Sequence, residues 1–169
     1  MVRALALFWS CAVTLAGLGV CWPLPPDTFR HYVKLQAEDI ASKIQRHRDQ
    51  QSHLSVNIEI VDKSLSLDRS IEGLGSIVET LNSFQKALES LPNSTNAQMS
   101  RDVGTLQSYL EQRMVALQCS QRKLTVEKNL ETFLKNHRPF PVTLSHTLLD
   151  RLQKYLIKLT RNLDQLKIC

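Results

Sequence analysis

The sequence lacks the short motifs that mark common catalytic and nucleotide-binding sites. It contains no G-x-G-x-x-G, no P-loop, no G-x-S-x-G and no H-E-x-x-H. Neighbouring acidic residues such as Glu38 and Asp39, and Asp150 further along, fall on polar faces of amphipathic stretches, so they do not form a buried acid–base pair. We therefore predict a protein that is not an enzyme and needs no cofactor.

Histidine is scarce, and its spacing does not suggest a metal site. The five histidines are His31, His47, His53, His137 and His146. They show no repeated ligand spacing with cysteines or carboxylates of the kind that zinc sites use. We interpret them as surface side chains, and we predict no bound metal.

Long apolar runs are absent except at the N-terminus. Arg3 is followed by an apolar stretch from Ala4 to Val20, and small residues precede Trp22. A basic start, an apolar middle and a small-residue exit are typical of a secretory signal peptide. A membrane anchor is the alternative, but the stretch is short and contains glycines, whereas a spanning helix needs about 20 apolar residues. We predict a signal peptide at residues 1–21 and a secreted, extracellular domain at residues 22–169.

Only four cysteines are present, and the signal cleavage decides how they pair. Cleavage after Gly19 or after Cys21 fits, and we favour Cys21. Cys11 and Cys21 then leave with the signal and Cys119 and Cys169 remain, whereas earlier cleavage would keep Cys21 as an odd thiol. Joining the terminal cysteine to Cys119 would close a loop of about fifty residues, a constraint worth roughly 4 kcal/mol. We predict this disulfide, which leaves no thiol nucleophile.

The excess of positive charge is small. Once Arg3 is removed, 20 basic and 16 acidic residues remain, scattered along the chain. The densest basic cluster runs from Lys43 to Arg48 and includes Arg46 and His47. We interpret it as the solvated end of a helix, with contact to heparin or to an acidic receptor as the alternative. No nucleic-acid partner is expected of a secreted chain with this charge.

Blocks typical of β-strands are absent, and four amphipathic stretches occupy most of the chain. They predict helices at about 27–49, 70–91, 98–118 and 142–167. Their apolar stripes are Phe29, Val33, Ala37, Ile40, Ala41 and Ile44; Ile71, Leu74, Val78, Leu81, Phe84, Leu88 and Leu91; Met99, Val103, Leu106, Leu110, Met114 and Leu117; and Leu148, Leu149, Leu152, Leu156, Leu159, Leu163 and Leu166. Each helix would be about 30 Å long. Burying four such stripes together predicts an all-α four-helix bundle.

The lengths of the links predict how the helices are connected. The link at residues 92–97 is short, so the second and third helices should be antiparallel. The links at residues 50–69 and 119–141 can run the length of the bundle, at about 3.3 Å per residue. The topology is then up-up-down-down, with two long crossovers. It places Cys119 and Cys169 at one end, whereas an antiparallel last pair would separate them by about 30 Å, beyond the reach of a disulfide.

Both crossovers carry apolar patterns. Between residues 54 and 60, apolar and polar residues alternate, which predicts an extended segment lying on the bundle. In the second crossover, Val126, Leu130, Phe133 and Leu134 repeat at helical spacing. They predict a short extra helix near residues 125–135 that caps an open end of the bundle.

The short turn between the second and third helices carries a possible modification site. Asn93-Ser94-Thr95 is an N-glycosylation sequon. Such tripeptides also arise by chance. In an exposed turn of a secreted protein, we expect Asn93 to be glycosylated.

Several segments resemble the leptin family, within the long-chain class I helical cytokines. Lys86–Ser94, followed by Met99–Val103, is similar to the end of the second helix, the Pro-Ser turn and the start of the third helix in leptins. Arg151-Leu152-Gln153, then Leu163-Asp164 and a terminal cysteine, resembles the leptin C-terminal pattern. Cys119 and Cys169 have the spacing of the leptin disulfide. The resemblance covers most of the chain from about Ile71, except the second crossover, and the first helix aligns only loosely.

The resemblance implies a function. Leptins are hormones that bind a class I cytokine receptor, the leptin receptor, and activate kinase–transcription factor signalling that controls energy balance and appetite. They bind the receptor's cytokine-homology module through a face of the first and third helices. A second site, near the start of the fourth helix, engages the immunoglobulin-like domain of another receptor. That position corresponds to Thr143-Leu144 here, where leptins carry Ser-Thr.

Helical periodicity locates the first of these faces independently. Opposite the core stripes, the first helix carries His31, Leu35, Glu38 and Ser42, and the third helix carries Arg101, Thr105, Ser108 and Gln112. Leu35 is informative because it is apolar among polar neighbours. We predict that these residues, with Thr143 and Leu144, bind the receptor ectodomain.

Two alternative functions remain. A secreted helical lipid-binding protein would have broad apolar faces that open onto lipid, whereas the stripes of the third and fourth helices are narrow and favour a closed core. A different four-helix cytokine would use another receptor. No stretch after the signal is apolar enough to span a bilayer, so we expect no membrane insertion. We also expect the free protein to be a monomer.

Overall fold

The computed structural model describes residues 26–51, 70–91, 93–119, 134–135, 139 and 141–169. Its main elements are α2 (Pro26–Gln51), α3 (Leu74–Glu89), α4 (Ser94–Ala116), α6 (Pro141–Arg161) and the 3-10 helix η2 (Leu163–Lys167). No strand occurs among the described residues. The predicted all-α four-helix fold is confirmed.

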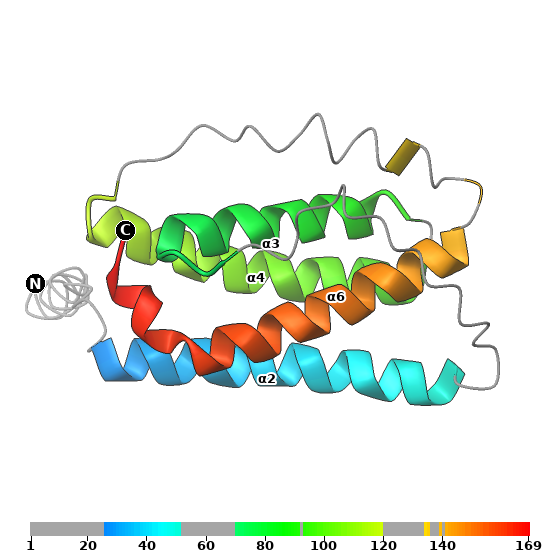
Figure 1. Cartoon of the computed structure of the whole chain (residues 1–169), viewed down its shortest axis with the longest axis horizontal. Helices are drawn as coiled ribbons and strands as arrows, with labels where there is room; N and C mark the ends of the chain where they lie inside the picture. The colour runs from blue at the N-terminus through cyan, green and yellow to red at the C-terminus, as the bar shows by residue number, and fades with distance from the viewer. Residues whose placement is uncertain (1–25, 52–69, 92, 120–133, 136–138, 140) are drawn as a thin grey trace, which may run out of the picture.

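The helices have the up-up-down-down arrangement. α2 and α3 run in one direction, and α4 and α6 run in the other (Figure 1). α2 packs against α6 and α4, and α3 packs mainly against α4. The predicted disulfide joins Cys119, after the end of α4, to Cys169, with the two Cα atoms 5.3 Å apart. The linker lengths and the cysteine positions therefore predicted the connectivity correctly.

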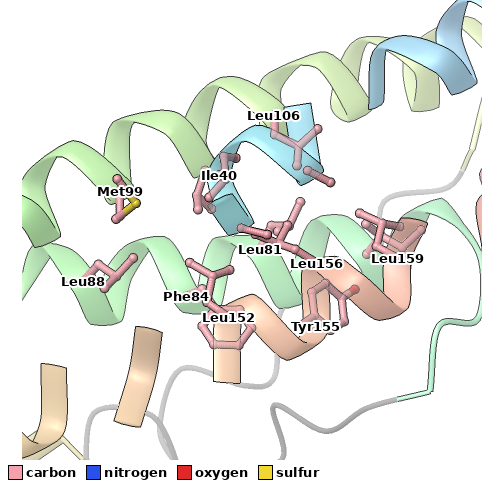
Figure 2. Packing of buried hydrophobic residues seen from close by; sticks show 14 of the residues in the cluster. Ile40, Leu81, Phe84, Leu88, Met99, Leu106, Leu152, Tyr155, Leu156 and Leu159 are labelled. Carbon is pink, nitrogen blue, oxygen red and sulfur yellow. The ribbon is translucent and has the colours of Figure 1, made fainter. Parts of the chain in front are cut away.

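The predicted apolar stripes form one core (Figure 2). The stripe of α2 is buried throughout, and Leu159 of α6 is 0% exposed. On α3 the predicted stripe included Val78, which is only half-buried, whereas Ile77 is buried, because the core spacing continues from Leu74 through Ile77 to Leu81. The other core residues that the stripes missed are Ala87, Leu144 and Tyr155, and Leu117 of the predicted third stripe is exposed.

The C-terminal tail packs on the start of α3, and this helix begins later than predicted. Gly73 has φ 90°, a conformation that glycine adopts readily and other residues do not. A Cβ atom at Gly73 would lie 2.8 Å from the Ile168 carbonyl oxygen. The Leu74 amide donates a hydrogen bond to the same oxygen at 2.8 Å, so the tail satisfies an N–H group that a helix N-terminus leaves free. α3 consequently begins at Leu74 and not near Ser70.

α4 begins earlier than its apolar stripe suggested. Asn93 is its N-cap, and the Asn93 Oδ1 atom accepts a hydrogen bond from the Thr95 amide at 3.0 Å. Asparagine is among the strongest N-cap residues, so the helix extends through the polar residues that precede Met99. At the other end of the chain, regular α-helix stops at Arg161 and the predicted fourth helix continues only as η2.

Some predictions fall on residues that the structure does not describe. The signal peptide at 1–21, the extended segment at 54–60 and most of the helix predicted at 125–135 lie outside the described residues. Within that last segment, Leu134 and Lys135 are helical, and Leu134 packs half-buried against the core. Of the helices described, none has the length and apolar character needed to cross a membrane.

Candidate functional site

Aromatic side chains fill the join between α2 and α4. The rings of Phe29 and Tyr109 stack with their centroids 5.0 Å apart, and the centroids of Tyr32 and Tyr109 are 4.3 Å apart. The Arg113 guanidinium carbon lies 5.3 Å from the centroid of the Phe29 ring. Phe29 is buried, whereas Tyr32 and Tyr109 are half-buried, so the outer part of this cluster faces solvent. Burial, and then the nearby Tyr32 phenol, raise the pKa of Tyr109.

Leu35 extends this cluster along α2. It lies three residues after Tyr32, which places the two side chains on neighbouring positions of the helix surface. Its exposed fraction is 51%, which is high for a leucine. The other residues that the sequence analysis placed on this helix face, His31, Glu38 and Ser42, are also exposed. Leu35 is therefore apolar surface surrounded by polar groups.

The predicted face of α4 is exposed and polar. Arg101, Thr105, Ser108 and Gln112 all have exposed side chains. The Arg101 guanidinium donates a hydrogen bond to the Gln98 side chain at 2.8 Å, and the Thr105 hydroxyl donates one to the Arg101 carbonyl at 3.0 Å. These residues border the aromatic cluster on its α4 side, so the two predicted half-faces lie on adjacent helices.

An ion pair fixes the two helices beside this face. Lys43 Nζ lies 3.1 Å from an oxygen of Asp102 on α4 and 2.7 Å from an oxygen of Asp39 on its own helix. Hydrogen bonds to Asp39 and then to Asp102 raise the pKa of Lys43. Two residues of the predicted basic cluster thus pair with acids on other helices, Lys43 here and Arg48 with Asp150. The interpretation of the whole cluster as a solvated helix end was wrong in that respect.

Tyr32, Tyr109 and Arg113 were not among the predicted site residues. Tyr32 directly precedes the core residue Val33, and Tyr109 directly precedes the core residue Leu110. A residue next to a core position lies at the edge of the buried stripe, about 100° around the helix. The two tyrosines lie at such edges, on helices that were expected to be neighbours. Their positions could therefore have predicted the cluster, whereas the predicted site contained only residues opposite the core.

The start of α6 requires a correction. Leu144 is 1% exposed and belongs to the core, so the prediction that its side chain contacts a receptor is wrong. Leu144 lies four residues before Leu148, which places it on the same buried stripe. Thr143 is half-buried, and its carbonyl accepts a hydrogen bond from the Thr147 hydroxyl at 3.0 Å. The exposed apolar residue here is Val142, at 77%.

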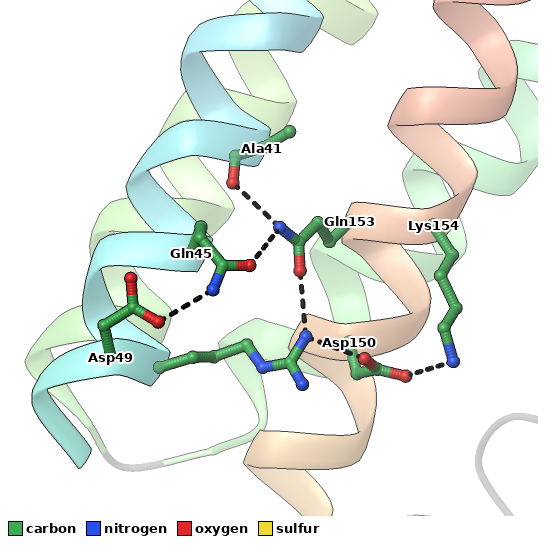
Figure 3. Close-up of polar contacts among 7 residues, drawn as sticks. Ala41, Gln45, Asp49, Asp150, Gln153 and Lys154 are labelled. Atoms are coloured by element: carbon green, nitrogen blue, oxygen red, sulfur yellow. Dashed lines mark hydrogen bonds and ion pairs between the residues drawn. The ribbon is translucent and has the colours of Figure 1, made fainter. Parts of the chain in front are cut away.

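The join between α2 and α6 is polar (Figure 3). Gln153 donates hydrogen bonds to the Gln45 side chain at 2.9 Å and to the Ala41 carbonyl at 3.4 Å. Arg48 donates to Asp150 at 2.8 Å and to Gln153 at 2.9 Å. Gln153, the last residue of the Arg-Leu-Gln motif, is therefore a structural link between two helices.

No group of three or more His, Cys, Asp or Glu side chains among the described residues could hold a metal ion. Four long helices in an up-up-down-down bundle with two long crossovers define the class of growth-hormone-like helical cytokines.

The family model described as Leptin matches residues 29–169. The chain therefore belongs to the leptin family. This is a family of hormones that bind a cytokine receptor, not of enzymes. The match includes the first helix, which the short motifs aligned only loosely. A comparison with curated proteins finds no match.

Proposed function

We propose that this chain is a secreted leptin-like hormone. It binds the ectodomain of a leptin-type class I cytokine receptor and activates kinase–transcription factor signalling in energy balance and appetite. The observation that carries the proposal is the half-exposed cluster of Tyr32, Leu35 and Tyr109 on the α2–α4 face of a leptin-family bundle.

This cluster has the composition of a binding hot spot. Two of its three residues are tyrosines, which are enriched at such positions, and a polar rim that excludes water surrounds hot spots. Here the rim consists of exposed polar residues on both helices: His31, Glu38 and Ser42 on α2, and Arg101, Thr105, Ser108 and Gln112 on α4. Because the Tyr109 ring is already stacked on Phe29, it loses little conformational freedom on binding, which favours affinity.

The start of α6 is the proposed second site, with Val142 replacing Leu144 as the apolar contact. Val142 and Thr143 lie at the end of the bundle where α6 begins. Contact between this end and the immunoglobulin-like domain of another receptor molecule would bring two receptors together. Binding and activation would then depend on different surfaces of one bundle.

Receptor affinity and signalling, measured on the same variants, test this separation. Leu35→Asp with Ser108→Glu should weaken binding to the leptin receptor ectodomain at least tenfold, because an apolar side chain that the receptor would cover is replaced by an unpaired charge. Ile157→Asp is the matched control, since Ile157 is 39% exposed on α6, and its affinity should stay within twofold. Circular dichroism should show the same helicity for all three proteins. Unchanged affinity of the Leu35 variant would remove the α2–α4 proposal.

The second site has its own variant. Val142→Ala with Thr143→Ala should leave affinity for the cytokine-homology module within twofold but reduce receptor phosphorylation in cells at least threefold. Full phosphorylation would show that the start of α6 is not the activation site. A panel of other class I receptor ectodomains tests the alternative of a different cytokine, and binding to phosphatidylcholine vesicles tests the lipid-binding alternative.

Secretion through a signal peptide is part of the proposal. It is supported by the apolar N-terminus and by membership of a family of secreted hormones. The protein recovered from the medium of expressing cells should begin at Trp22 by mass spectrometry. Retention in the membrane fraction with residues 1–21 attached would contradict it. Sedimentation of the secreted protein should show a monomer.

A further inference from the structure

The sequon Asn93-Ser94-Thr95 forms the start of α4. Asn93 is exposed and has an extended backbone, with φ −148° and ψ 136°. Its Oδ1 atom caps the helix by accepting a hydrogen bond from the Thr95 amide. The atom that an N-linked glycan occupies is Nδ2, which takes no part in this cap. A glycan is therefore compatible with the helix start.

The sequon lies at the same end of the bundle as the start of α6. Asn96, three residues after Asn93, is buried, and its side-chain oxygen accepts a hydrogen bond from the Ser145 hydroxyl at 2.8 Å. α4 and α6 run in the same direction (Figure 1). Counting back three residues on each helix places Asn93 about level with Val142. The side chain of Val142 is 77% exposed.

The α2–α4 face is further from the sequon. Tyr109 follows Asn93 by sixteen residues, which is about 24 Å along the helix axis at 1.5 Å per residue. On α2, the His47 ring nitrogen lies 3.5 Å from the Thr95 hydroxyl, so His47 marks the level of the sequon. Leu35 precedes His47 by twelve residues, or about 18 Å along α2. A group attached to Asn93 thus lies level with the start of α6 and away from Leu35 and Tyr109 at the centre of the α2–α4 face, whereas Arg101 on the rim of that face is about 12 Å along α4.

We propose that Asn93 carries an N-linked glycan, and that this glycan screens the exposed start of α6 while leaving the α2–α4 face open. An N-glycan is bulky and strongly hydrated, so it would hinder a second receptor domain from reaching Val142 and Thr143. The effect of the glycan is to lower signalling potency without lowering affinity for the first receptor module. The second half of this inference rests on the proposed two-site function.

The presence of the glycan is tested by mass. Asn93 is in the only Asn-x-Ser/Thr sequence of the chain, so any N-glycan must be attached there. The full chain is secreted from mammalian cells as wild type and as Thr95→Ser, which keeps the sequon. Asn93→Asp keeps the capping oxygen, and Thr95→Ala keeps Asn93 itself, but both destroy the sequon. Wild type and Thr95→Ser should lose mass on treatment with peptide N-glycosidase, and the other two variants should not. Secreted wild type without a glycan would overturn the proposal.

The role of the glycan is tested by potency. Glycosidase-treated wild type and Asn93→Asp should both signal at least about threefold more potently than the glycosylated protein, with affinity for the cytokine-homology module within twofold. In the Val142→Ala, Thr143→Ala background, removing the glycan should no longer change potency. Equal potency with and without the glycan, or a parallel change in affinity, would overturn the screening role. If the protein neither binds nor signals, the proposed function fails, whereas the mass measurement still decides whether Asn93 is modified.

Discussion

α2 meets a different helix on each side, and the two joins are built from different chemistry. Against α6, hydrogen bonds and an ion pair are added to the core packing, among them Arg48 with Asp150 at 2.8 Å and Gln153 with Gln45 at 2.9 Å (Figure 3). Against α4, the ion pair of Lys43 with Asp102 is accompanied by stacked rings, with Tyr109 at their centre. In the α2–α6 join, the polar groups form hydrogen bonds with each other. In the α2–α4 join, apolar side chains remain partly exposed to solvent.

On the proposed function, that difference separates a structural join from a recognition surface. Polar groups that already bond each other gain little from a third molecule, since binding would exchange one set of hydrogen bonds for another. Half-exposed tyrosine and leucine side chains gain about 25 cal/mol for every Å² of apolar surface that a partner covers. The α2–α4 face therefore has binding free energy to contribute, and the α2–α6 join contributes mainly stability.

Removing the disulfide should have the largest effect, because it ties the C-terminal tail to the end of α4 at the end of the bundle where α3 begins. Cys119→Ser with Cys169→Ser should lower the free energy of unfolding by about 4 kcal/mol in urea denaturation. It also frees the tail that hydrogen-bonds Leu74 and the η2 segment whose Asp164 pairs with Arg30. Amide hydrogen exchange should therefore rise first at the start of α3. A loss below about 1 kcal/mol would mean that the tail holds its place without the bond.

A core substitution should lower stability and leave receptor affinity unchanged. Leu159 is fully buried, so Leu159→Ala should lower the free energy of unfolding by about 3 kcal/mol through lost contacts and a cavity. Receptor affinity per folded molecule should stay unchanged, because Leu159 reaches neither surface. A loss under about 0.5 kcal/mol would show that this stripe is not the core.

The polar join should contribute stability and no affinity. The side chains of Arg48 and Asp150 are 30% and 24% exposed, so solvent screens their pair partly. A double-mutant cycle with Arg48→Met and Asp150→Asn should give a coupling energy of about 1 kcal/mol. Receptor affinity should be the same for all four proteins. A tenfold loss of affinity in either single variant would place the receptor on the α2–α6 side and reverse the comparison.

The smallest effect concerns pH at the far end of the α2–α4 join. Burial, and then the neighbouring His146 on α6, lower the pKa of His47, which also faces Thr95 of α4. The unfolded chain then binds a proton more readily than the folded one. The stabilising contribution is present above about pH 6.5, the usual histidine value, and is lost as pH falls through the lowered folded-state pKa. His47→Gln should flatten the stability profile across this range, and an unchanged slope would contradict it.

Much of the fold could be predicted from local patterns, because helical spacing and linker length are properties of the sequence alone. The buried stripe of α2 and the pairing of Cys119 with Cys169 are examples. The positive φ of Gly73 could not be predicted, because it accommodates a tail that lies almost a hundred residues further on. The cap at Asn93 could have been predicted, since asparagine is a common residue at the N-cap of a helix.

The candidate site could be predicted less completely, because a surface depends on how helices are turned toward each other. The exposure of Leu35 follows from the periodicity of one helix. The Tyr109 cluster depends on the packing of two helices, which no single periodicity contains. Leu144 was misplaced because it was aligned by position with a family site, whereas its spacing from Leu148 puts it in the core.

Oxidative footprinting of the complex with the receptor's cytokine-homology module tests the comparison between the two joins most directly. Tyr32, Leu35 and Tyr109 are all at least partly exposed in the free protein, and so is Ile157 on α6. On binding, we expect the oxidation rates of Tyr32, Leu35 and Tyr109 to fall severalfold, because the receptor covers the α2–α4 face. The rate at Ile157 should not change. Protection of Ile157 with unchanged rates at Leu35 and Tyr109 would contradict the account.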